Sequence, residues 1–530
     1  DDDDDGASLG NNNGKVNGGE IIELFVGITN YGSQDAENII GTLISDNANV
    51  IIQNNEVAYG NLSSEESVVA AEPFIISLND GLTEGTDLGL AINLYDTTGN
   101  TSNDIIDVNV AGNMIVATRI DVLGTVEDVL HPGESSNIAI RLDNMGSTTA
   151  HNIVGTITSP SPFIEILDEI GTWTSIPANG SMVNNENTFV ISALEETIPG
   201  ATAYLMVNIE TENGYTTNSV LEIQIGTPTV YDPVGPDDHG YYIYDSGDIG
   251  YLLSPVYNWI EIDSRYGGEG THLNSLTDNG DNGDDVQTID LPFTFKMYGI
   301  DYNQISICSN GWISMGDTDM ESFRNYQIPG VGGPSPMIAV FWDDLKLTNG
   351  GRVYTWYDDE NHKFYIQWSR VRTFQNSSTE NFQVSLFDPN YYFTPTGDGE
   401  IFMQYETFNN TSYGSYSSWG APIHGDYCTI GIEDHTMKIG LQYTFNNTYH
   451  PAAMALGDGT SLFITTRGSD IRLEGDLNID NSMDIFDILI LTDQILGYTN
   501  NVNLYVADIN GDGMVNIMDM IRLIQRVMQW

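Results

Sequence analysis

Two acidic segments near the C-terminus repeat one residue spacing, and no other part of the sequence constrains its local fold as strongly. Each segment has acidic or amide side chains at positions 1, 3, 5, 9 and 12. These residues are Asp476, Asn478, Asp480, Asp484 and Asp487 in the first segment, and Asp508, Asn510, Asp512, Asn516 and Asp519 in the second. Ca²⁺ prefers oxygen ligands, and a twelve-residue loop with this spacing supplies them. We therefore predict two calcium loops, with Ser482 and Met514 at position 7 completing the ligand sets.

The residues after each loop have the periodicity of an α-helix. The predicted core faces are Ile485, Ile488, Leu489, Thr492, Ile495 and Leu496 after the first loop, and Ile517, Met520, Ile521, Ile524, Val527 and Met528 after the second. Two such units should pack together into a small α-helical module at 470–530. A module of about sixty residues buries little apolar surface, so bound metal should supply much of its folding free energy.

The stretches GDLNIDNSMDIFDILILTDQIL and ADINGDGMVNIMDMIRLIQRVM resemble the dockerin family. Asp at position 12 of both loops agrees with that resemblance, whereas Asn481 stands at position 6 of the first loop where the second has Gly513. The resemblance implies Ca²⁺ binding and a cohesin-like partner, contacted mainly through loop positions 10 and 11.

Positions 10 and 11 are Ile485 with Phe486 and Ile517 with Met518. The helical period places the two isoleucines on the core face, whereas the resemblance places them on the recognition face, and the sequence leaves both interpretations open. Four apolar residues lie outside the predicted core stripe, namely Phe486, Ile490, Met518 and Leu523. Such residues favour a docking surface, although they could instead pack against the preceding domain. The predicted partner-binding set is Ile485, Phe486, Ile490, Ile517, Met518 and Leu523.

The charge of the chain excludes nucleic-acid binding as its function. Among 530 residues, 75 are acidic and 16 are basic, which gives a net charge of −59. Such a field repels nucleic acid and attracts divalent cations. Solubility or a salty medium would account for the same charge without any binding role.

Other general features of the sequence concern membrane spans, processing and the cysteines. No apolar run is long enough to span a membrane. We expect an extracellular or cell-surface location. The chain starts at Asp1 without a signal peptide, so we expect a mature product cut from a longer precursor. Cys308 and Cys428 could form one disulfide in an oxidising compartment or remain as two buried thiols.

Residues 1–14 contain few apolar side chains and are predicted to be a disordered acidic and Asn-rich tail. The region from 15 to 226 then repeats itself, since Gly19-Glu20 recurs as Gly133-Glu134, Asn30-x-Gly32 as Asn144-x-Gly146, and Asn38-Ile39-x-Gly41-Thr42 as Asn152-Ile153-x-Gly155-Thr156. Short alternating runs between turn residues predict two tandem Ig-like β-sandwiches, at 15–113 and 114–226. The pattern resembles the CARDB-type adhesion module, which implies a spacer role, and we interpret Asn-x-Gly as a turn.

Residues 227–239 are rich in Pro, Gly and Asp and are predicted to be a linker. Residues 240–467 should form a larger aromatic-rich β-sandwich, with clear strands at 305–308, 338–342, 352–357, 363–368 and 382–387. The order LPFTFKMYG, ISICSNGWISMG, IAVFWDDL and GGRVYTWYDDENHKFYIQWSRV resembles nidogen-like modules appended to secreted gingipain-type peptidases. That resemblance carries no catalytic residue.

Further cations could bind the acidic loop 278–285, through Asp278, Asp281, Asp284 and Asp285. The pair Asp343-Asp344 is the next candidate. A solvated acidic turn is the favoured interpretation of that loop, because its ligand spacing is not fixed. Most tryptophans of the third region should be core residues; the alternative is a sugar-stacking platform that uses Trp342 and Trp356.

The sequence contains no recognisable active site. None of its eight histidines belongs to a metal or nucleophile motif. His424 lies four residues before Cys428, but a structural cysteine is the favoured interpretation. Paired carboxylates for glycoside hydrolysis carry no weight in a chain with so many acids.

The fold class is therefore predicted as mainly β, ending in the α-helical calcium module, and we do not expect an enzyme. We expect a secreted structural or adhesive protein that assembles into a surface layer or filament through that module. Its partner would be a cohesin-like domain or another copy of the chain. One alternative is the non-catalytic tail of a secreted peptidase or glycan-degrading enzyme, whose catalytic domain would precede Asp1. A second alternative is a carbohydrate-binding module for cell-surface glycan.

Overall fold

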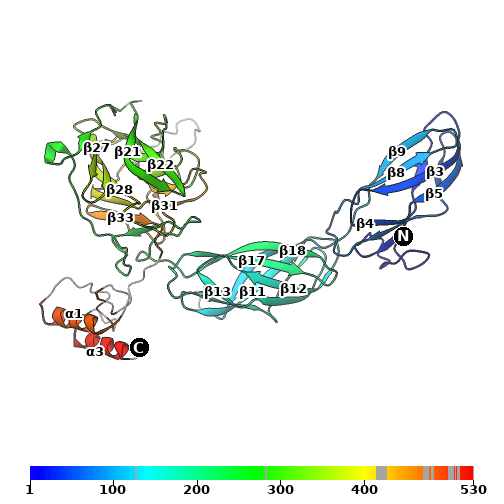
Figure 1. Cartoon of the computed structure of the whole chain (residues 1–530), viewed down its shortest axis with the longest axis horizontal. Coiled ribbons are helices and arrows are strands. Elements are labelled where there is room, and N and C mark those ends of the chain that lie inside the picture. The colour runs from blue at the N-terminus through cyan, green and yellow to red at the C-terminus, as the bar shows by residue number, and fades with distance from the viewer. Residues whose placement is uncertain are drawn as a thin grey trace. The chain divides into compact units, whose positions relative to one another are not determined.

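The structure is a computed structural model that describes residues 1–125, 128–280, 283–412, 427–468, 475, 477, 478, 483–498, 507, 509 and 514–528. Strands account for most of its regular structure, and the described part has two α-helices, both near the C-terminus (Figure 1). The chain divides into two compact units, Asp1–Leu194 with Thr202–Gln224 and Glu195–Ala201 with Ile225–Trp530. The predicted mainly-β class with a C-terminal helical module is confirmed.

The first unit contains two β-sandwiches. Strands of the first sandwich are β1 (Ile21–Leu24), β2 (Gly27–Thr29), β3 (Ala36–Ser45), β4 (Val50–Asn54), β5 (Glu56–Leu62), β6 (Ser67–Val69), β7 (Phe74–Leu78), β8 (Leu90–Tyr95) and β9 (Thr101–Ile106). Its sheets have the orders β1-β7-β4 and β5-β3-β8-β9, with β2 and β6 as a separate pair. Buried side chains alternate along β5 and β7, so these strands face a core on one side only.

The second sandwich repeats this arrangement. Its strands are β10 (Ile115–Leu123), β11 (Ser135–Asn144), β12 (Ala150–Thr158), β13 (Ile164–Asp168), β14 (Ile170–Ile176), β15 (Gly180–Val183), β16 (Phe189–Ala193), β17 (Thr202–Glu210) and β18 (Thr216–Gln224). The sheet orders are β10-β11-β16-β13 and β14-β12-β17-β18. The second order matches β5-β3-β8-β9 strand for strand, so the sequence repeat is also a structural repeat.

One aromatic contact is the same in both copies. Tyr59 donates from its hydroxyl to the carbonyl of Val26 at 3.0 Å, and Trp173 donates from Nε1 to the carbonyl of Ile140 at 3.1 Å. A glycine faces each ring, because a Cβ at Gly155 would lie 2.8 Å from Trp173 Cζ3. Gly41 has the same relation to Tyr59. The repeated glycine therefore makes room for the repeated aromatic residue.

The Asn-x-Gly element forms a turn in both copies, as predicted. Asn30 Oδ1 accepts a hydrogen bond from the Gly32 amide at 2.9 Å, and Asn144 Oδ1 accepts one from the Gly146 amide at 3.0 Å. Each asparagine also donates from Nδ2 to two carbonyls of its own sandwich. These side chains are occupied in holding the turn.

The N-terminal segment differs from its predicted disorder. Leu9 and Ile21 exchange two main-chain hydrogen bonds of 2.9 Å. The α-ammonium group of Asp1 donates to the Glu23 carbonyl at 2.7 Å. The segment thus pairs with the outer edge of β1. In the second sandwich, β10 pairs with the corresponding edge of β11. The pairing satisfies main-chain groups that an open edge would leave unpaired.

The two sandwiches are joined by hydrogen bonds to one carboxylate. Glu84 Oε2 accepts from the Gly112 amide at 2.9 Å and from the amide and hydroxyl of Ser147 at 2.9 and 2.7 Å. Lys15 Nζ donates to the Ser147 carbonyl at 3.0 Å. These four hydrogen bonds hold the junction between the sandwiches.

The third domain (residues 227–468) belongs to the second unit. Its elements are β19 (Tyr242–Asp245), η2 (Ser264–Tyr266), β20 (Thr271–His272), β21 (Val286–Met297), β22 (Ile300–Cys308), β23 (Trp312–Met315), β24 (Met337–Trp342), β25 (Leu345–Lys346), β26 (Arg352–Asp358), β27 (Lys363–Thr373), β28 (Thr379–Phe387), β29 (Ile401–Thr407), β30 (Thr429–Glu433), β31 (Gly440–Phe445), β32 (Thr448–Tyr449) and β33 (Thr460–Thr465). One sheet has the order β19-β33-β29-β28-β27-β26-β20, and the other has the order β21-β22-β23-β24-β30-β31-β32. Buried apolar residues of both sheets form one core, and the five strands predicted in this region are present.

The tryptophans of this domain lie mainly in the core. Trp312, Trp342 and Trp368 are almost completely buried, and Trp356 is half-buried. Trp419 lies outside the described residues. Because Trp342 is buried, it cannot stack on a sugar as the alternative interpretation required. Cys308 and Cys428 are buried free thiols, so the disulfide alternative does not hold in this structure.

The segment 227–239, predicted to be a linker, packs against the third domain. Val234 and Ile243 exchange two main-chain hydrogen bonds of 2.9 Å. Tyr298 donates from its hydroxyl to Asp237 Oδ2 at 2.8 Å, and Tyr251 donates to Asp232 Oδ1 at 2.7 Å. The segment therefore belongs to the fold of this domain.

Candidate functional site

The C-terminal module is built on two helices with the same start. Helix α1 (Ile485–Ile495) has Asp484 as its N-cap, and Asp484 Oδ1 accepts from the Phe486 amide at 2.7 Å. Helix α3 (Ile517–Val527) has Asn516 as its N-cap, and Asn516 Oδ1 accepts from the Met518 amide at 2.8 Å. In both loops, position 9 is therefore the N-cap of the helix, which explains why short polar residues stand there.

Aspartate at position 12 closes each loop. Asp487 is fully buried, and its Oδ2 accepts from the Asp484 amide at 2.8 Å. Its Oδ1 accepts from the amides of Leu477 and Asn478 at 2.7 and 3.1 Å. The carboxylate thereby ties loop positions 2 and 3 to the first turn of α1. Asp519 is also fully buried and accepts from the Asn516 amide at 2.8 Å.

The predicted metal ligands divide into two groups. Asn478, Asp484, Asp487, Met514, Asn516 and Asp519 are described, whereas Asp476, Asp480, Ser482, Asp508, Asn510 and Asp512 lie outside the described residues. Within the described part, no three His, Cys, Asp or Glu side chains form a group that could hold a metal ion. The described donors are carboxylate, amide and main-chain oxygens, and two of the carboxylates are buried. This donor chemistry fits a hard cation such as Ca²⁺.

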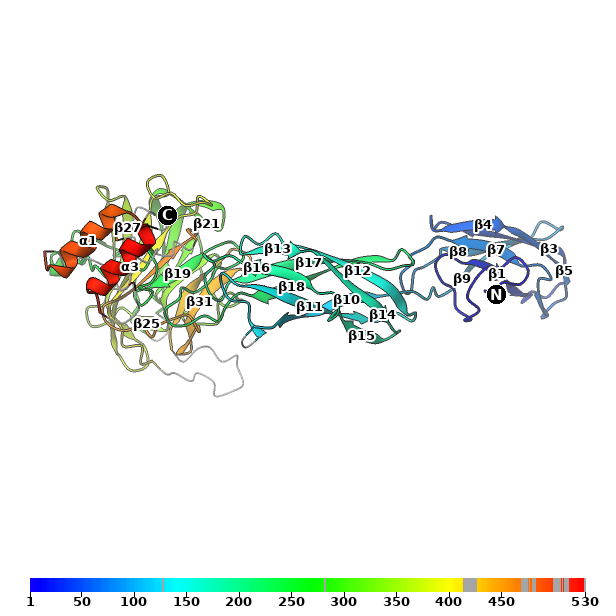
Figure 2. The same cartoon turned by 90° about the horizontal axis from the view of Figure 1, so that it is seen from below.

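The core of the module lies between α1 and α3, which run side by side (Figure 2). Leu491 and Leu523 are fully buried, together with Ala507, and Ile488 and Met520 pack beside them. Leu523 was predicted to bind the partner, and that prediction is wrong because its side chain fills this core.

Exposed apolar residues form a second stripe on each helix. They are Ile485, Phe486, Leu489 and Leu496 on α1 and its C-cap, and Ile517, Met518, Ile521 and Met528 on α3 and its C-cap, with exposed fractions from 43% to 79%. We call these eight residues the exposed stripe. Each member of the first set has its counterpart 32 positions later, as with Ile485 and Ile517.

The exposed stripe shows that loop position 10 does not lie in the core, contrary to what the helical period had predicted. Ile485 and Ile517, at loop position 10, point to the surface. The predicted surface residues Phe486 and Met518 are exposed as well, whereas Ile490 is half-buried. Four further residues were predicted to be core residues and are exposed, so the sequence reasoning missed them as surface candidates: Leu489, Leu496, Ile521 and Met528. The 32-residue repeat was the signal that could have paired them.

Comparisons with known proteins support the interpretation of this module. Residues 474–528 match the model of the dockerin type I domain. The chain ends in a dockerin type I domain. Domains of this kind bind Ca²⁺ and cohesins, and the proteins that carry them are typically extracellular or on the cell surface. Among the described residues, no helix of the chain is long and apolar enough to cross a membrane.

Residues 264–462 match the NIDO-related model, which agrees with the nidogen-like resemblance of the third domain. Both matched domain types are non-catalytic. No curated protein matches the chain.

Matches to solved structures are distant. They include red sea bream transglutaminase, with a TM-score of 0.21, 9% identity and coverage of 40% of this chain and 30% of that protein. A protein of unknown function from Porphyromonas gingivalis W83 has a TM-score of 0.13 and 13% identity, over 39% of this chain and 91% of that one. The PapD-like domain 7 of human CEP192 has a TM-score of 0.12 and 13% identity, over 21% and 87%. These matches carry no argument about function.

The acidic loop of the third domain is partly buried. Asp278 is only 5% exposed, and burial together with the charges of Asp284 and Asp285 raises its pKa to about 6. Asp284 Oδ1 accepts from Asn310 Nδ2 at 2.9 Å. Asp281 lies outside the described residues. The sequence favoured a solvated acidic turn here, and that interpretation is wrong at Asp278 because its side chain is buried.

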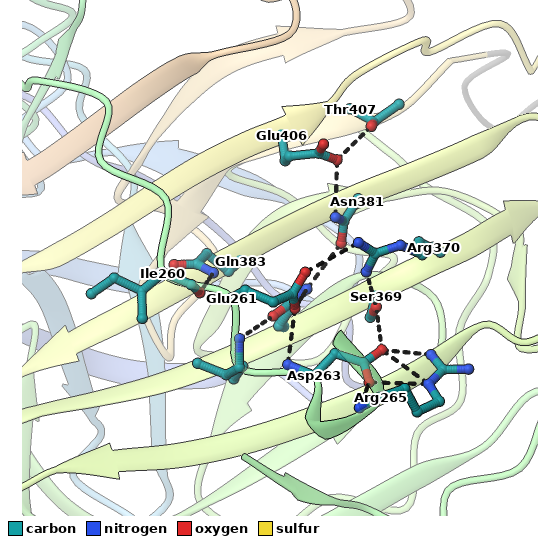
Figure 3. A network of polar contacts seen from close by, with 12 residues as sticks. Ile260, Glu261, Asp263, Arg265, Ser369, Arg370, Asn381, Gln383, Glu406 and Thr407 are labelled. Atoms are coloured by element: carbon teal, nitrogen blue, oxygen red, sulfur yellow. Dashed lines mark hydrogen bonds and ion pairs between the residues drawn. The ribbon is translucent and has the colours of Figure 1, made fainter. Parts of the chain in front are cut away.

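A polar network covers the outer face of the larger sheet (Figure 3). The segment 258–266 crosses β29, β28 and β27, and it is held by the side chains of Gln404, Gln383 and Gln367. These three glutamines are almost completely buried. Their alternation with core residues along the strands was the signal in the sequence that could have revealed a polar, covered face.

Ionic groups anchor the same segment. Arg265 Nη2 donates to Asp263 Oδ2 at 2.6 Å, and the Ser369 hydroxyl donates to the same oxygen at 2.7 Å. Although burial raises the pKa of Asp263, the hydrogen bonds from Arg265 and Ser369 lower it below its usual value. Arg370 pairs with Glu261 at 3.1 Å. Because these groups are paired with one another, we interpret the network as structural.

The thiol of Cys428 does not have the properties of a nucleophile. Burial, together with the charges of Asp343 and Glu380, raises its pKa well above the usual value, whereas a reactive cysteine needs a lowered pKa. His424, its sequence neighbour, lies outside the described residues. The structural interpretation of Cys428 agrees with this environment.

Proposed function

We propose that this protein is a secreted, non-catalytic structural or adhesive component that joins an extracellular assembly through its dockerin domain. Calcium would stabilise the two loops, and the exposed stripe would contact the partner. The observation that carries the proposal is the stripe itself, because its eight apolar side chains lie on a small module whose own core is already filled by Leu491 and Leu523. Exposed apolar surface of this kind marks interaction sites.

A cohesin-like domain is the partner that we favour. The stripe begins at Ile485 and Ile517, directly after the loop residues that cap the helices. Any change in the loops on calcium binding would therefore reach the docking residues directly. Docking would therefore depend on calcium without a conformational change elsewhere in the module.

Calorimetric titration of the full chain with a recombinant cohesin domain tests the proposal. The informative variant is Ile485→Asp combined with Ile517→Asp, because aspartate at the first position of a helix is compatible with the helix dipole and should leave folding intact. Buried apolar anchors cost about 2 kcal/mol or more when lost, so affinity should fall roughly thirty-fold or more. Ile105→Asp is the matched control, since Ile105 is 80% exposed but lies in the first sandwich.

Two results would contradict the proposal. One is equal cohesin affinity of the double variant and the Ile105→Asp control. The other is binding that persists unchanged in EGTA. Electron microscopy of the chain alone, with and without EGTA, separates the possible partners: calcium-dependent filaments would show that another copy of the chain is the partner, and monomers in both conditions would leave the cohesin-like domain.

A further inference from the structure

A pair of buried carboxylates lies in the turn that follows β19. Asp245 and Asp248 are 1% and 0% exposed. The turn is closed by a main-chain hydrogen bond of 3.0 Å from the Asp248 amide to the Asp245 carbonyl.

Asp245 has the contacts of an ionised group. Its Oδ1 accepts from the Gly247 amide at 2.7 Å. Its Oδ2 accepts from the Tyr443 hydroxyl at 2.8 Å and from the Met454 amide at 3.0 Å. Burial raises the pKa of Asp245 above its usual value, whereas these three donors lower it and favour the charged form.

Asp248 is different, because only one of its oxygens has a partner. Oδ2 accepts from the Asp245 amide at 2.7 Å, whereas Oδ1 is buried without any hydrogen-bond partner. Burial, together with the charges of Asp245 and Asp232, raises the pKa of Asp248 to about 9. Protonation would remove the charge of Asp248, but among the described residues the structure gives Oδ1 no hydrogen-bond partner. A buried polar atom without a partner costs about 1–3 kcal/mol.

No basic side chain compensates these charges. None of the ion pairs among the described residues includes Asp232, Asp245 or Asp248. The same situation recurs in this domain, because four of its described buried carboxylate oxygens lack partners: Asp248 Oδ1, Asp278 Oδ2, Asp343 Oδ2 and Glu433 Oε1. A chain with a net charge of −59 attracts cations to such positions.

We propose that the turn 245–248 is a Ca²⁺ site in which Asp248 Oδ1 is a direct ligand and Asp245 and Asp232 supply further negative charge. The carboxylates of the turn offer oxygen ligands, which suit a hard cation rather than zinc or copper. Only two carboxylates belong to the turn, so main-chain carbonyls and water would complete the ligand shell. The site is separate from the dockerin loops.

The site would also fix the segment that enters the third domain. Asp232 belongs to that segment, and its Oδ1 already accepts from the Tyr251 hydroxyl at 2.7 Å. A cation beside Asp248 would attract Asp232 as well. Calcium would then stabilise the third domain as well as the C-terminal module.

The test compares Asp248→Asn with the wild-type full chain by calcium equilibrium dialysis and differential scanning calorimetry. The variant should bind one calcium ion fewer per chain. Its third-domain transition should fall by about 5–10 °C in millimolar calcium and stay unchanged in EGTA. Asp359→Asn, which removes one exposed charge of the same domain, should change neither quantity.

A stability change of the opposite sign in Asp248→Asn would overturn the proposal. If Oδ1 holds water or nothing, Asp248→Asn removes a buried ionisable group, so stability should be unchanged or raised with calcium and in EGTA, at unchanged stoichiometry. Should Asp248→Asn fail to fold in either condition, the half-buried Asp232→Asn replaces it: a several-fold weaker third calcium site supports the proposal, and unaltered binding refutes it. Cohesin affinity should be the same in all these variants, so this site and the docking proposal can fail independently.

Discussion

Asp487 offers the sharpest test of how the C-terminal module holds together. Replacing it by alanine removes a fully buried carboxylate that accepts three main-chain hydrogen bonds, from Leu477, Asn478 and Asp484, at 2.7 to 3.1 Å. We expect the module to lose its fold while the rest of the chain keeps its own.

The magnitude follows from those contacts. A hydrogen bond to a charged group contributes about 1.5–3 kcal/mol, so three of them amount to about 4.5 kcal/mol at the lower end. A module of this size has a total stability of only about 3–5 kcal/mol without further support. The loss is therefore comparable with the whole stability of the module, even before any metal ligand is considered.

Hydrogen exchange of the full chain in saturating calcium measures the effect directly. Amides of α1 and α3 should be protected in the wild type and unprotected in Asp487→Ala, with Asp487→Asn between them because it keeps one acceptor oxygen. Asp493→Ala is the matched control, since Asp493 is exposed on the same helix. Equal protection in Asp487→Ala and Asp493→Ala would refute the reasoning.

Three further predictions concern other parts of the chain. Gly155→Ala would place a Cβ 2.8 Å from Trp173 and should destabilise the second sandwich by about 1–3 kcal/mol, measured by calorimetry against Gly457→Ala, which has open space around it. Asp263→Asn should destabilise the third domain by about 3 kcal/mol at pH 7, because it leaves the partly buried Arg265 without its carboxylate partner. The pKa of Asp263 is lowered in the folded state, so this stabilisation is present above about pH 4 and is lost as the pH falls further; the difference between variant and wild type should shrink there. EGTA should leave protection of the first and second sandwiches unchanged while it removes that of α1 and α3, and equal loss everywhere would contradict a calcium requirement confined to the second unit.

The spacing of the acidic residues was sufficient to predict the C-terminal module, but not which helix face is buried. The centre of the core is formed by Leu491 and Leu523, and neither was among the predicted core residues. On a helix of eleven residues, apolar side chains cover more than one face, so the period alone does not choose between Leu489 and Leu491. The contact between the two helices makes that choice.

Long-range contacts account for the remaining differences. The Tyr443 hydroxyl that holds Asp245 is 198 residues away in the sequence, so no local pattern marks this aspartate as buried. Composition predicted disorder for residues 1–14, yet a free sheet edge beside β1 provides hydrogen-bond partners for them. In both places a polar segment is ordered by a partner that the sequence does not place next to it.

The matching hydrogen bonds of Tyr59 and Trp173 have a consequence for building longer arrays. The two rings differ, yet each donates to the equivalent carbonyl of its own sandwich and each sits over an equivalent glycine. All the groups in this contact come from within one copy. An engineered chain with extra copies spliced in series should therefore preserve this contact in every copy, whichever of the two rings the inserted copy carries.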